Sequence, residues 1–309
     1  MRFGIVGAGA VGGYYGALLA RAGHDVAMIA RGAHLDALRA GGIAVRSEAV
    51  GDFVAHVTAE ADPSRVGPVD TVIFAVKTYD NASALPLVRP LVGASTSVLT
   101  LQNGVDSAEM VAEAVGAPKV LAGATYVATA IESPGVIRQT GSHRRIVFGE
   151  WFHPADFISS RVDAIARALQ TADIQVEPVA DARVPIWEKF VYLAPFAAFT
   201  GAARLPIGPI AADPESRAAF LQAVAEVDAV ARASGIRIAA DTRARIEKYL
   251  DDLPASTRSS LLIDLSQGKR IEIETLAGSV VRRGRAVGVA TPMMCALYAV
   301  LRPWAEPRA

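Results

Sequence analysis

The 309-residue sequence is poor in several features that mark particular classes of protein. It has a single cysteine, Cys295, so an intramolecular disulfide framework is excluded and a reducing compartment is favoured. Acidic and basic residues balance at 31 each, which leaves no net positive field to attract nucleic acid or a membrane surface. The longest apolar runs have the length of strands, so we expect no membrane span. Because strand-like sequence begins at Phe3, we also expect no signal peptide and a cytoplasmic location.

The sequence also lacks the patterns of two common kinds of catalytic centre. The five histidines are scattered, and none stands at a metal-ligand spacing from another histidine, a cysteine or a carboxylate, so we expect no metal site. No G-x-S-x-G sequence is present to form the elbow of a serine nucleophile. Lysine is scarce, since it supplies only five of the 31 basic residues. A lysine in an apolar setting therefore needs a particular explanation.

The N-terminal stretch MRFGIVGAGAVGGYYG has the features of a dinucleotide-binding turn. An apolar run over residues 3–6, typical of a buried strand, is followed by glycines in G-x-G-x-x-G spacing and then by helix-forming sequence. The first glycine would allow a tight turn, the second a close approach to a pyrophosphate, and the third close packing of helix on strand. We predict that this backbone binds a dinucleotide; a glycine-rich turn without a ligand is the alternative. The predicted cofactor-binding residues are Gly7, Ala8, Gly9, Ala10, Val11 and Gly12.

The end of the second predicted strand, residues 25–30, indicates which dinucleotide binds. Sites specific for NAD place an acidic residue there to accept from the ribose 2′-hydroxyl, whereas an arginine there pairs with a 2′-phosphate. In this chain the strand has no acid at its tip and is followed by Arg31. We therefore predict NADP (NADPH) as the cofactor; a solvated surface arginine is the alternative.

Strand-like and helix-like segments alternate along the first part of the chain, which predicts a parallel sheet covered on both faces. Lys77 and Asn103 each directly follow an apolar strand, as Gly7 and Arg31 do. Ligands bind beyond the carboxyl ends of such strands, so we predict that Lys77 and Asn103 share one crevice with the glycine turn. Residues 125–149 resemble short antiparallel strands that extend the sheet.

Beyond about residue 180 nearly every segment has a helical pattern. The predicted fold class is α/β, with a Rossmann-type doubly wound sheet in an NADP-binding domain (1–180) and an all-helical substrate and catalytic domain (181–309). In the second domain we predict a buried helix over residues 183–200, kinked or broken at Pro195, and another over residues 272–287. Alanine-rich helices of this kind could form the face of a homodimer.

Lys189 lies in the sequence IWEKFVYL, among large apolar residues. If NADPH reduces a carbonyl, the resulting alkoxide needs a positioned proton donor, and without a metal or a suitable histidine the candidates are lysine and tyrosine. A desolvated lysine has a lowered proton affinity and can give up its proton. The alternative is a lysine that extends to solvent and pairs with Glu188.

In their order and separations these features resemble the ketopantoate reductase (2-dehydropantoate 2-reductase) family, over essentially the whole chain. The resemblance implies NADPH-dependent reduction of a small 2-oxo acid to the 2-hydroxy acid, with ketopantoate as the substrate and pantothenate biosynthesis as the pathway. The motifs that carry it are Gly7-Ala-Gly-Ala-Val-Gly12, Arg31, Val76-Lys77, Gln102-Asn103-Gly104, Trp187-Glu-Lys189, Ser259-Ser260 with Asp264, and Glu272-Ile-Glu274 leading to Gly278.

The resemblance also implies a role for each residue of the site. Lys189 would be the general acid at the carbonyl oxygen, and Glu272 would engage the substrate and position Lys189. Asn103 would contact the nicotinamide ribose and the substrate, and Lys77 would lie beside the nicotinamide. Ser260 would bind the substrate carboxylate.

The chain departs from the family pattern on the helix that carries Lys189. The family's catalytic lysine is usually followed by asparagines four and eight residues later, on the same helix face, but this chain has Leu193 and Ala197 there. Two lost amide donors would cost on the order of 1 kcal/mol each toward a hydroxyl-bearing substrate. A less polar 2-oxo acid is therefore the alternative substrate.

Two further alternatives remain open. Glu274 could take the role of Glu272, but the two residues would point to different faces of the predicted helix, so both cannot fill it. The protein could also be a non-catalytic NADPH-binding sensor. The retained Lys189 and Glu272 argue against a sensor, which has no need of a proton donor beside the nicotinamide.

Overall fold

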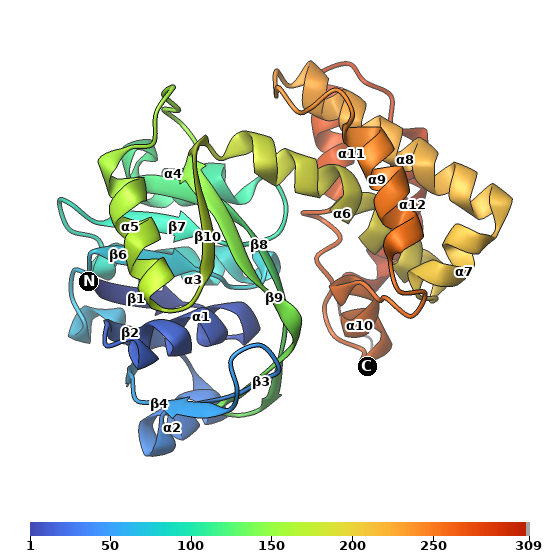
Figure 1. The fold of residues 1–309 in the computed structure, drawn as a ribbon. Coiled ribbons are helices and arrows are strands. Elements are labelled where there is room, and N and C mark those ends of the chain that lie inside the picture. The colour runs from blue at the N-terminus through green and yellow to red at the C-terminus, as the bar shows by residue number, and fades with distance from the viewer. Residues whose placement is uncertain (307–309) are drawn as a thin grey trace. The chain divides into compact units, whose positions relative to one another are not determined.

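The computed structural model describes residues 1–306, which divide into two compact units. The first comprises residues 1–102 and 107–183, and the second comprises residues 103–106 and the chain from Val184 onward. Figure 1 colours the chain along its length, so that the first unit runs mainly from blue to green and the second mainly from yellow to red. The short segment between the two parts of the first unit therefore belongs structurally to the second.

One ten-stranded sheet forms the centre of the first unit. Its strands are β1 (Arg2–Val6), β2 (Asp25–Ile29), β3 (Ile43–Ser47), β4 (Phe53–Ala55), β5 (Thr58–Glu60), β6 (Thr71–Phe74), β7 (Ser97–Thr100), β8 (Val120–Ser133), β9 (Val136–Glu150) and β10 (Gln175–Asp181). They lie in the order β4-β3-β9-β8-β7-β6-β1-β2-β5, with β10 beside β9. β1 is parallel to both of its neighbours, and β7 and β8 continue the parallel order beyond β6. Since the chain winds outward from β1 in both directions, the predicted doubly wound sheet is confirmed.

The antiparallel extension consists of two long strands rather than the short ones predicted over residues 125–149. β8 and β9 pair along their length, and residues 141–143 of β9 interrupt the register between the pairs Val127↔Arg144 and Ala128↔Thr140. The sequence Gly-Ser at residues 141 and 142 therefore lies in a bulge of one strand, where the prediction placed a turn between two. On its other edge β9 pairs with β3 through its first half and with β10 through its second half.

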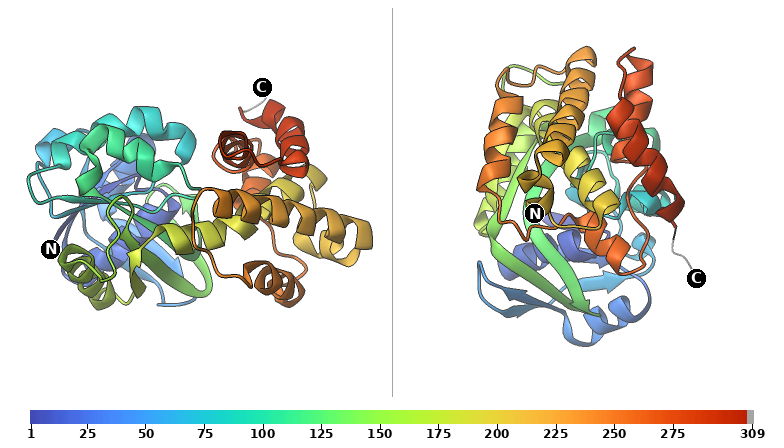
Figure 2. Two further views of the ribbon diagram at one scale, coloured as in Figure 1. Left: turned by 90° about the horizontal axis from the view of Figure 1, so that it is seen from above. Right: turned by 90° about the vertical axis from the view of Figure 1, so that its right-hand side faces the viewer.

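Helices cover both faces of this sheet (Figure 2). They are α1 (Ala10–Arg21), α2 (Gly32–Gly41), α3 (Asn81–Val88), α4 (Ser107–Val115) and α5 (Ser160–Thr171). α1 contributes four fully buried large side chains, Tyr14, Tyr15, Leu18 and Leu19, to a core that also contains Phe3 of β1. Burial of these side chains fixes the start of α1 at the end of β1, which is the place where a dinucleotide turn must be held.

Within residues 1–306, the regular structure of the second unit is helical. Its helices are α6 (Arg183–Ala203, of which Arg183 belongs to the first unit), α7 (Ile207–Ala212), α8 (Pro214–Ala233), α9 (Thr242–Asp252), α10 (Ser260–Ser266), α11 (Ala277–Ala286) and α12 (Pro292–Leu301). α6 continues through the buried Pro195, so of the two predicted outcomes, a kink or a break, the break does not occur. The rings of Tyr192 and Phe199, on either side of this proline, contact Phe220 of α8. This packing holds the helix together although the proline lacks an N–H donor.

The helix predicted over residues 272–287 begins later, at Ala277 of α11. The preceding residues form turns, and the side chains of Ile271 and Ile273 are both buried. Two buried side chains two residues apart do not fit one face of a helix, which explains the error. Glu272 and Glu274 therefore lie in a non-helical segment between α10 and α11.

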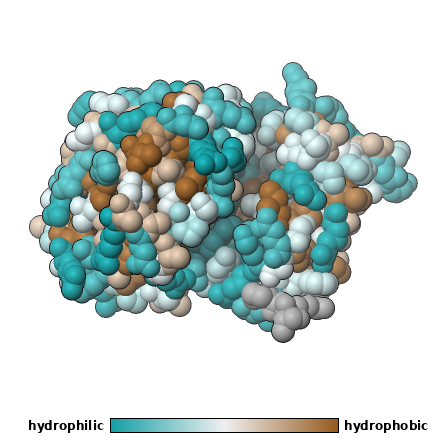
Figure 3. Space-filling model, turned by 90° about the horizontal axis from the view of Figure 1, so that it is seen from below, coloured by the Kyte–Doolittle hydropathy of each residue, from teal (hydrophilic) through white to brown (hydrophobic). Residues whose placement is uncertain are grey.

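Within residues 1–306, every helix is too short or too polar to traverse a lipid bilayer. Large exposed hydrophobic side chains such as Val54, Ile131 and Phe157 are scattered along the sequence. On the face drawn in Figure 3, hydrophobic residues lie interspersed with hydrophilic ones, as they do on most folded proteins.

Candidate functional site

The glycine turn of the first unit combines two glycines required by packing with one that is not. Gly7 has a φ of +98°, and a Cβ there would lie 2.6 Å from the backbone nitrogen of Val76. A Cβ on Gly12 would lie 2.2 Å from the carbonyl oxygen of Gly7, so α1 could not sit against the turn. A Cβ on Gly9 would meet no protein atom within 4 Å. The fold thus requires glycine at positions 7 and 12, whereas at position 9 the missing side chain only keeps the backbone open.

The start of α1 is suited to bind an anion. Gly9 is the N-cap residue, no side chain caps the helix there, and its first turn contains no acidic residue. The first N–H groups of a helix have no partner within the helix, and they lie at the positive end of its dipole. The open backbone at Gly9 and these N–H groups fit the pyrophosphate of a dinucleotide.

Two predicted residues follow strands of the same sheet. Arg31 follows β2 at the N-cap of α2; its side chain is 84% exposed and its guanidinium lies 3.7 Å from the carboxylate of Asp80. Lys77 follows β6 and is half-buried. Gly7, Arg31 and Lys77 are thus all placed at the carboxyl ends of β1, β2 and β6, in the first unit.

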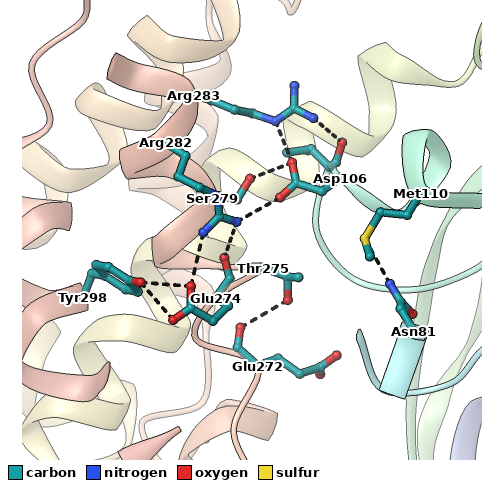
Figure 4. Close-up of polar contacts among 11 residues, drawn as sticks. Asn81, Asp106, Met110, Glu272, Glu274, Thr275, Ser279, Arg282, Arg283 and Tyr298 are labelled. Carbon is teal, nitrogen blue, oxygen red and sulfur yellow. Dashed lines mark hydrogen bonds and ion pairs between the residues drawn. The ribbon is translucent and has the colours of Figure 1, made fainter. Parts of the chain in front are cut away.

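Gln102 organises this edge of the sheet, although sequence reasoning gave it no role of its own. Its Nε2 donates hydrogen bonds to the carbonyl oxygen of Val76 (2.8 Å) and to Oδ1 of Asn81 (2.6 Å). Asn81 is buried and donates in turn to the sulfur of Met110 at 3.3 Å (Figure 4). Gln102 therefore fastens the end of β7 to the peptide just before Lys77. Its place directly after a strand was the signal that could have revealed it.

Asn103, which directly follows Gln102, is grouped with the second unit. The Nζ of Lys189 donates a hydrogen bond of 2.9 Å to its Oδ1. The two residues are 86 positions apart in the sequence, so no local pattern could show their contact. The next residue, Gly104, has a φ of +99° and lies close to the backbone of Thr275. A Cβ at this position would lie 2.9 Å from the carbonyl oxygen of Thr275, so the contact requires glycine.

The environment of Lys189 favours proton transfer. Burial lowers the pKa of this lysine to about 8, and the negative charge of Glu272 partly offsets the shift. Glu272 is itself 8% exposed. A lysine with a pKa near 8 holds its proton at neutral pH but releases it readily, which is the property of an effective general acid.

The geometry distinguishes Glu272 from its rival Glu274. Glu274 accepts hydrogen bonds of 2.9 Å from the hydroxyl of Tyr298 on both carboxylate oxygens, and it pairs with Arg282 at 3.2 Å. In Figure 4 its carboxylate faces these partners, while the side chain of Glu272 extends in another direction. Of the two carboxylates, it is Glu272 whose charge acts on Lys189.

The remaining predicted residues lie on α6 and α10. Ser260 is exposed at the first position of α10, after Ser259, which caps this helix through its contact with the N–H of Leu262. Leu193 and Ala197, four and eight residues after Lys189 on α6, lie on the same face of the helix as the lysine. The structure therefore brings together Asn103, Lys189 and Glu272 in the second unit, with an apolar stretch of α6 beyond the lysine.

The chain is similar to known proteins along both units. Residues 3–152 match the family model described as ketopantoate reductase PanE/ApbA, and residues 181–305 match the model for the C-terminal part of the same family. A 2-dehydropantoate 2-reductase of Mesorhizobium japonicum is 32% identical, with 100% of this chain and 99% of the relative covered.

Solved structures of ketopantoate reductases are also similar to this chain over nearly its whole length. A 2-dehydropantoate 2-reductase of Geobacter metallireducens has a TM-score of 0.90 at 32% identity, with 98% of this chain and 99% of that one covered. A PanE/ApbA family ketopantoate reductase of Ralstonia eutropha has a TM-score of 0.89 at 34% identity, with 99% and 98% covered.

Proposed function

This chain belongs to the ketopantoate reductase family, and from that premise we propose that it reduces ketopantoate to pantoate with NADPH, a step in pantothenate biosynthesis. Membership makes it an oxidoreductase that reduces a 2-oxo acid. The observation that carries the proposal is the Lys189 ammonium, with its pKa of about 8, which donates to Asn103 and lies in the field of Glu272. That group is a proton donor of the kind a carbonyl reduction requires.

We propose the following division of labour among the residues of the second unit. Lys189 donates its Nζ proton to the carbonyl oxygen of the substrate as negative charge develops there. Glu272 favours the ammonium form of Lys189 until that moment and engages the substrate. Asn103 orients the ammonium through its Oδ1, which leaves its amide NH2 group to donate to substrate and ribose. Ser260 binds the substrate carboxylate.

We assign NADP binding to residues 1–180, and substrate binding and catalysis to residues 181–309. The backbone of residues 7–12 would hold the pyrophosphate, Arg31 the 2′-phosphate and Lys77 the nicotinamide side. Support comes from the uncapped start of α1, from the exposed guanidinium of Arg31 and from the absence of an acid at the end of β2. When bound, the reduced nicotinamide supplies the hydride.

Steady-state kinetics of the purified protein test the proposal. NADPH oxidation is measured with ketopantoate and with a panel of simple branched 2-oxo acids. We expect the highest kcat/KM with ketopantoate. If every carbonyl tested leaves NADPH unoxidised although NADPH binds tightly, the protein is a sensor and the enzymatic proposal fails.

A second substrate class, 2-oxo acids with apolar side chains, is favoured by Leu193 and Ala197. These residues offer no hydrogen bond to a substrate hydroxyl, and a hydroxyl against Leu193 would be desolvated without a partner. If the panel shows that branched 2-oxo acids react as well as ketopantoate, this class replaces it. Leu193→Asn should then raise the relative rate with ketopantoate several-fold, by about 1 kcal/mol for one added hydrogen bond.

We also propose a cytoplasmic homodimer. The single cysteine is consistent with a reducing compartment. α12 carries no charged residue, and only Met294 and Leu301 of its ten residues are buried. A helix of this composition is suited to pack against a second copy. A monomer by sedimentation at micromolar concentration would contradict the dimer.

A further inference from the structure

The segment 103–106 is fastened to the second unit by a cluster of contacts that has no part in the reaction itself. The carboxylate of Asp106 accepts hydrogen bonds from Nε of Arg283 (2.7 Å), from the hydroxyl of Ser279 (3.0 Å) and from a guanidinium nitrogen of Arg282 (3.3 Å). Figure 4 shows these three groups of α11 converging on the one carboxylate. Three donors on a single carboxylate hold it far more firmly than one surface ion pair would.

Arg283 joins this cluster to the backbone of the segment and to the helix that bears Lys189. Besides Asp106, its guanidinium donates to the carbonyl oxygen of Val105 at 2.9 Å and lies 5.8 Å from the ring centre of Trp187. Val105 is 1% exposed and Trp187, two residues before Lys189 on α6, is also 1% exposed. A single side chain thus connects α11, the segment and α6.

The cluster is well placed to act on Asn103. Asn103 is three residues before Asp106, and its Oδ1 accepts a hydrogen bond from the Nζ of Lys189 at 2.9 Å. One end of the segment is therefore bonded to Lys189 and the other end to α11. Between them, Gly104 lies so close to Thr275 that a side chain would not fit. Without the Asp106 carboxylate, the segment would lose three hydrogen bonds that tie it to α11, and Asn103 would be held less firmly against Lys189.

We propose that Asp106 and Arg283 are positioning residues of this enzyme, which keep Asn103 in place as the acceptor that orients the Lys189 ammonium. The proposal rests on the proposed function, in which that ammonium is the general acid. Neither residue touches the reacting atoms. They act through the segment, and a positioning error of about 1 Å at a catalytic group is enough to cost a large factor in rate.

Kinetics of Asp106→Ala and Asp106→Asn test the proposal in the full-length protein. Asp106→Ala should lower kcat roughly tenfold to hundredfold and raise the KM for NADPH by a smaller factor, because Asn103 is displaced while the glycine turn proposed to hold the pyrophosphate is not. Asp106→Asn keeps an oxygen acceptor for Arg283 and should recover most of the rate. The matched control is Asp228→Ala, which breaks a similar pair with Arg232 (2.8 and 3.1 Å) in the same unit. It should lower Tm but leave kcat unchanged.

A double-mutant cycle shows whether Asp106 acts through Asn103. If it does, Asn103→Ala combined with Asp106→Ala should be no slower than Asn103→Ala alone. Losses that multiply in the double variant would overturn the proposal, as would an Asp106→Ala variant with unchanged kcat.

A titration separates failure of this proposal from failure of the proposed function. The chain has five lysines, so their ¹³Cε resonances are few enough to assign, and Lys189→Ala identifies the one of interest. Loss of the Asn103 acceptor disfavours the ammonium form, so the Lys189 midpoint should fall by the same amount in Asn103→Ala and in Asp106→Ala. It should stay at the wild-type value in Asp228→Ala. A midpoint unchanged in Asp106→Ala would overturn the positioning role, even if the wild-type protein reduced no 2-oxo acid.

Discussion

In the first unit the proposed site is shaped by the backbone, whereas in the second it is built from side-chain charge. Gly7 and Gly12 are fixed by contacts of 2.6 and 2.2 Å that a Cβ would have to make with backbone atoms. Lys189, by contrast, is adjusted by its burial, by the charge of Glu272 and by one hydrogen bond to Asn103. Substitutions in the first unit should therefore act mainly on cofactor affinity, and those in the second on turnover and its pH dependence.

The largest effect should come from Lys189→Ala, which removes the proton donor. We expect kcat to fall by on the order of 10² to 10⁴-fold, the usual contribution of a general acid, with the dissociation constant of NADPH nearly unchanged. The exposed Lys248 supplies the matched control, since Lys248→Ala should leave both quantities unchanged. If turnover and NADPH affinity fell together in Lys189→Ala, the lysine would be structural. Substitutions in the second unit would then not act on turnover alone, as the comparison requires.

The next largest effects should come from alanine substitutions at two glycines of the turn, which should differ in what they change. Gly12→Ala forces a clash with the carbonyl of Gly7 and should destabilise the protein by about 1 to 3 kcal/mol, besides abolishing NADPH binding. Gly9→Ala meets no protein atom, so its Tm should match that of the wild type while NADPH affinity falls at least roughly tenfold through contact with the phosphates. Thermal unfolding and fluorescence titration with NADPH measure both. A Gly9→Ala variant with wild-type affinity would remove the argument that this position faces the cofactor.

The pH dependence of the reaction tests whether side-chain charge controls the proposed site of the second unit. A general acid must be protonated to act, and the pKa of Lys189 is about 8. The rate constant kcat/KM for reduction should therefore be level below pH 8 and fall about tenfold per unit above it. The charge of Glu272 raises the pKa of Lys189, so Glu272→Gln should lower that pKa further and move the break to lower pH. A break that stayed in place or moved upward would contradict the coupling.

The smallest effect should be that of Arg31→Ala, because this side chain is 84% exposed and water competes for its contacts. Loss of one charge-assisted contact with a 2′-phosphate should weaken NADPH binding by about 1 to 2 kcal/mol, roughly tenfold, and leave NADH binding unchanged. Arg65→Ala, at another exposed arginine of the first unit, is the control. A preference for NADPH that survives Arg31→Ala would mean that another group recognises the phosphate.

The sequence predicted those parts of the fold that depend on local pattern. The glycine spacing and the apolar runs indicated β1, α1 and β2 close to their observed bounds, because turn, strand and helix follow one another within a few residues. β5 escaped detection, since three residues are too few to show a period. At Pro195 the prediction of a break was wrong, because burial of α6 outweighs the local cost of the proline.

The site was harder to predict where it depends on contacts between distant residues. The position of Asn103 after β7 predicted a place at the carboxyl edge of the sheet, but its hydrogen bond to Lys189, 86 residues further along the chain, left no local signal. Glu272 and Glu274 were alternatives until their partners distinguished them, and the helix assumed for both is a turn. Asp106 had no motif at all, because its three donors come from a helix more than 170 residues further along the chain. Charge, burial and distance are properties of the folded chain that spacing alone does not encode.

The way the large sheet ends has a consequence for the behaviour of the protein at high concentration. The two outermost strands of its order, β4 and β5, are three residues long, and β10, which extends the sheet beside β9, carries Pro178. Short edge strands, and an edge strand that contains a proline, present few unpaired backbone N–H groups to a neighbouring molecule. Another chain can therefore form few backbone hydrogen bonds with the edges of this sheet, and such strand pairing is the first step of many aggregates. We expect the protein to stay dispersed through expression and storage.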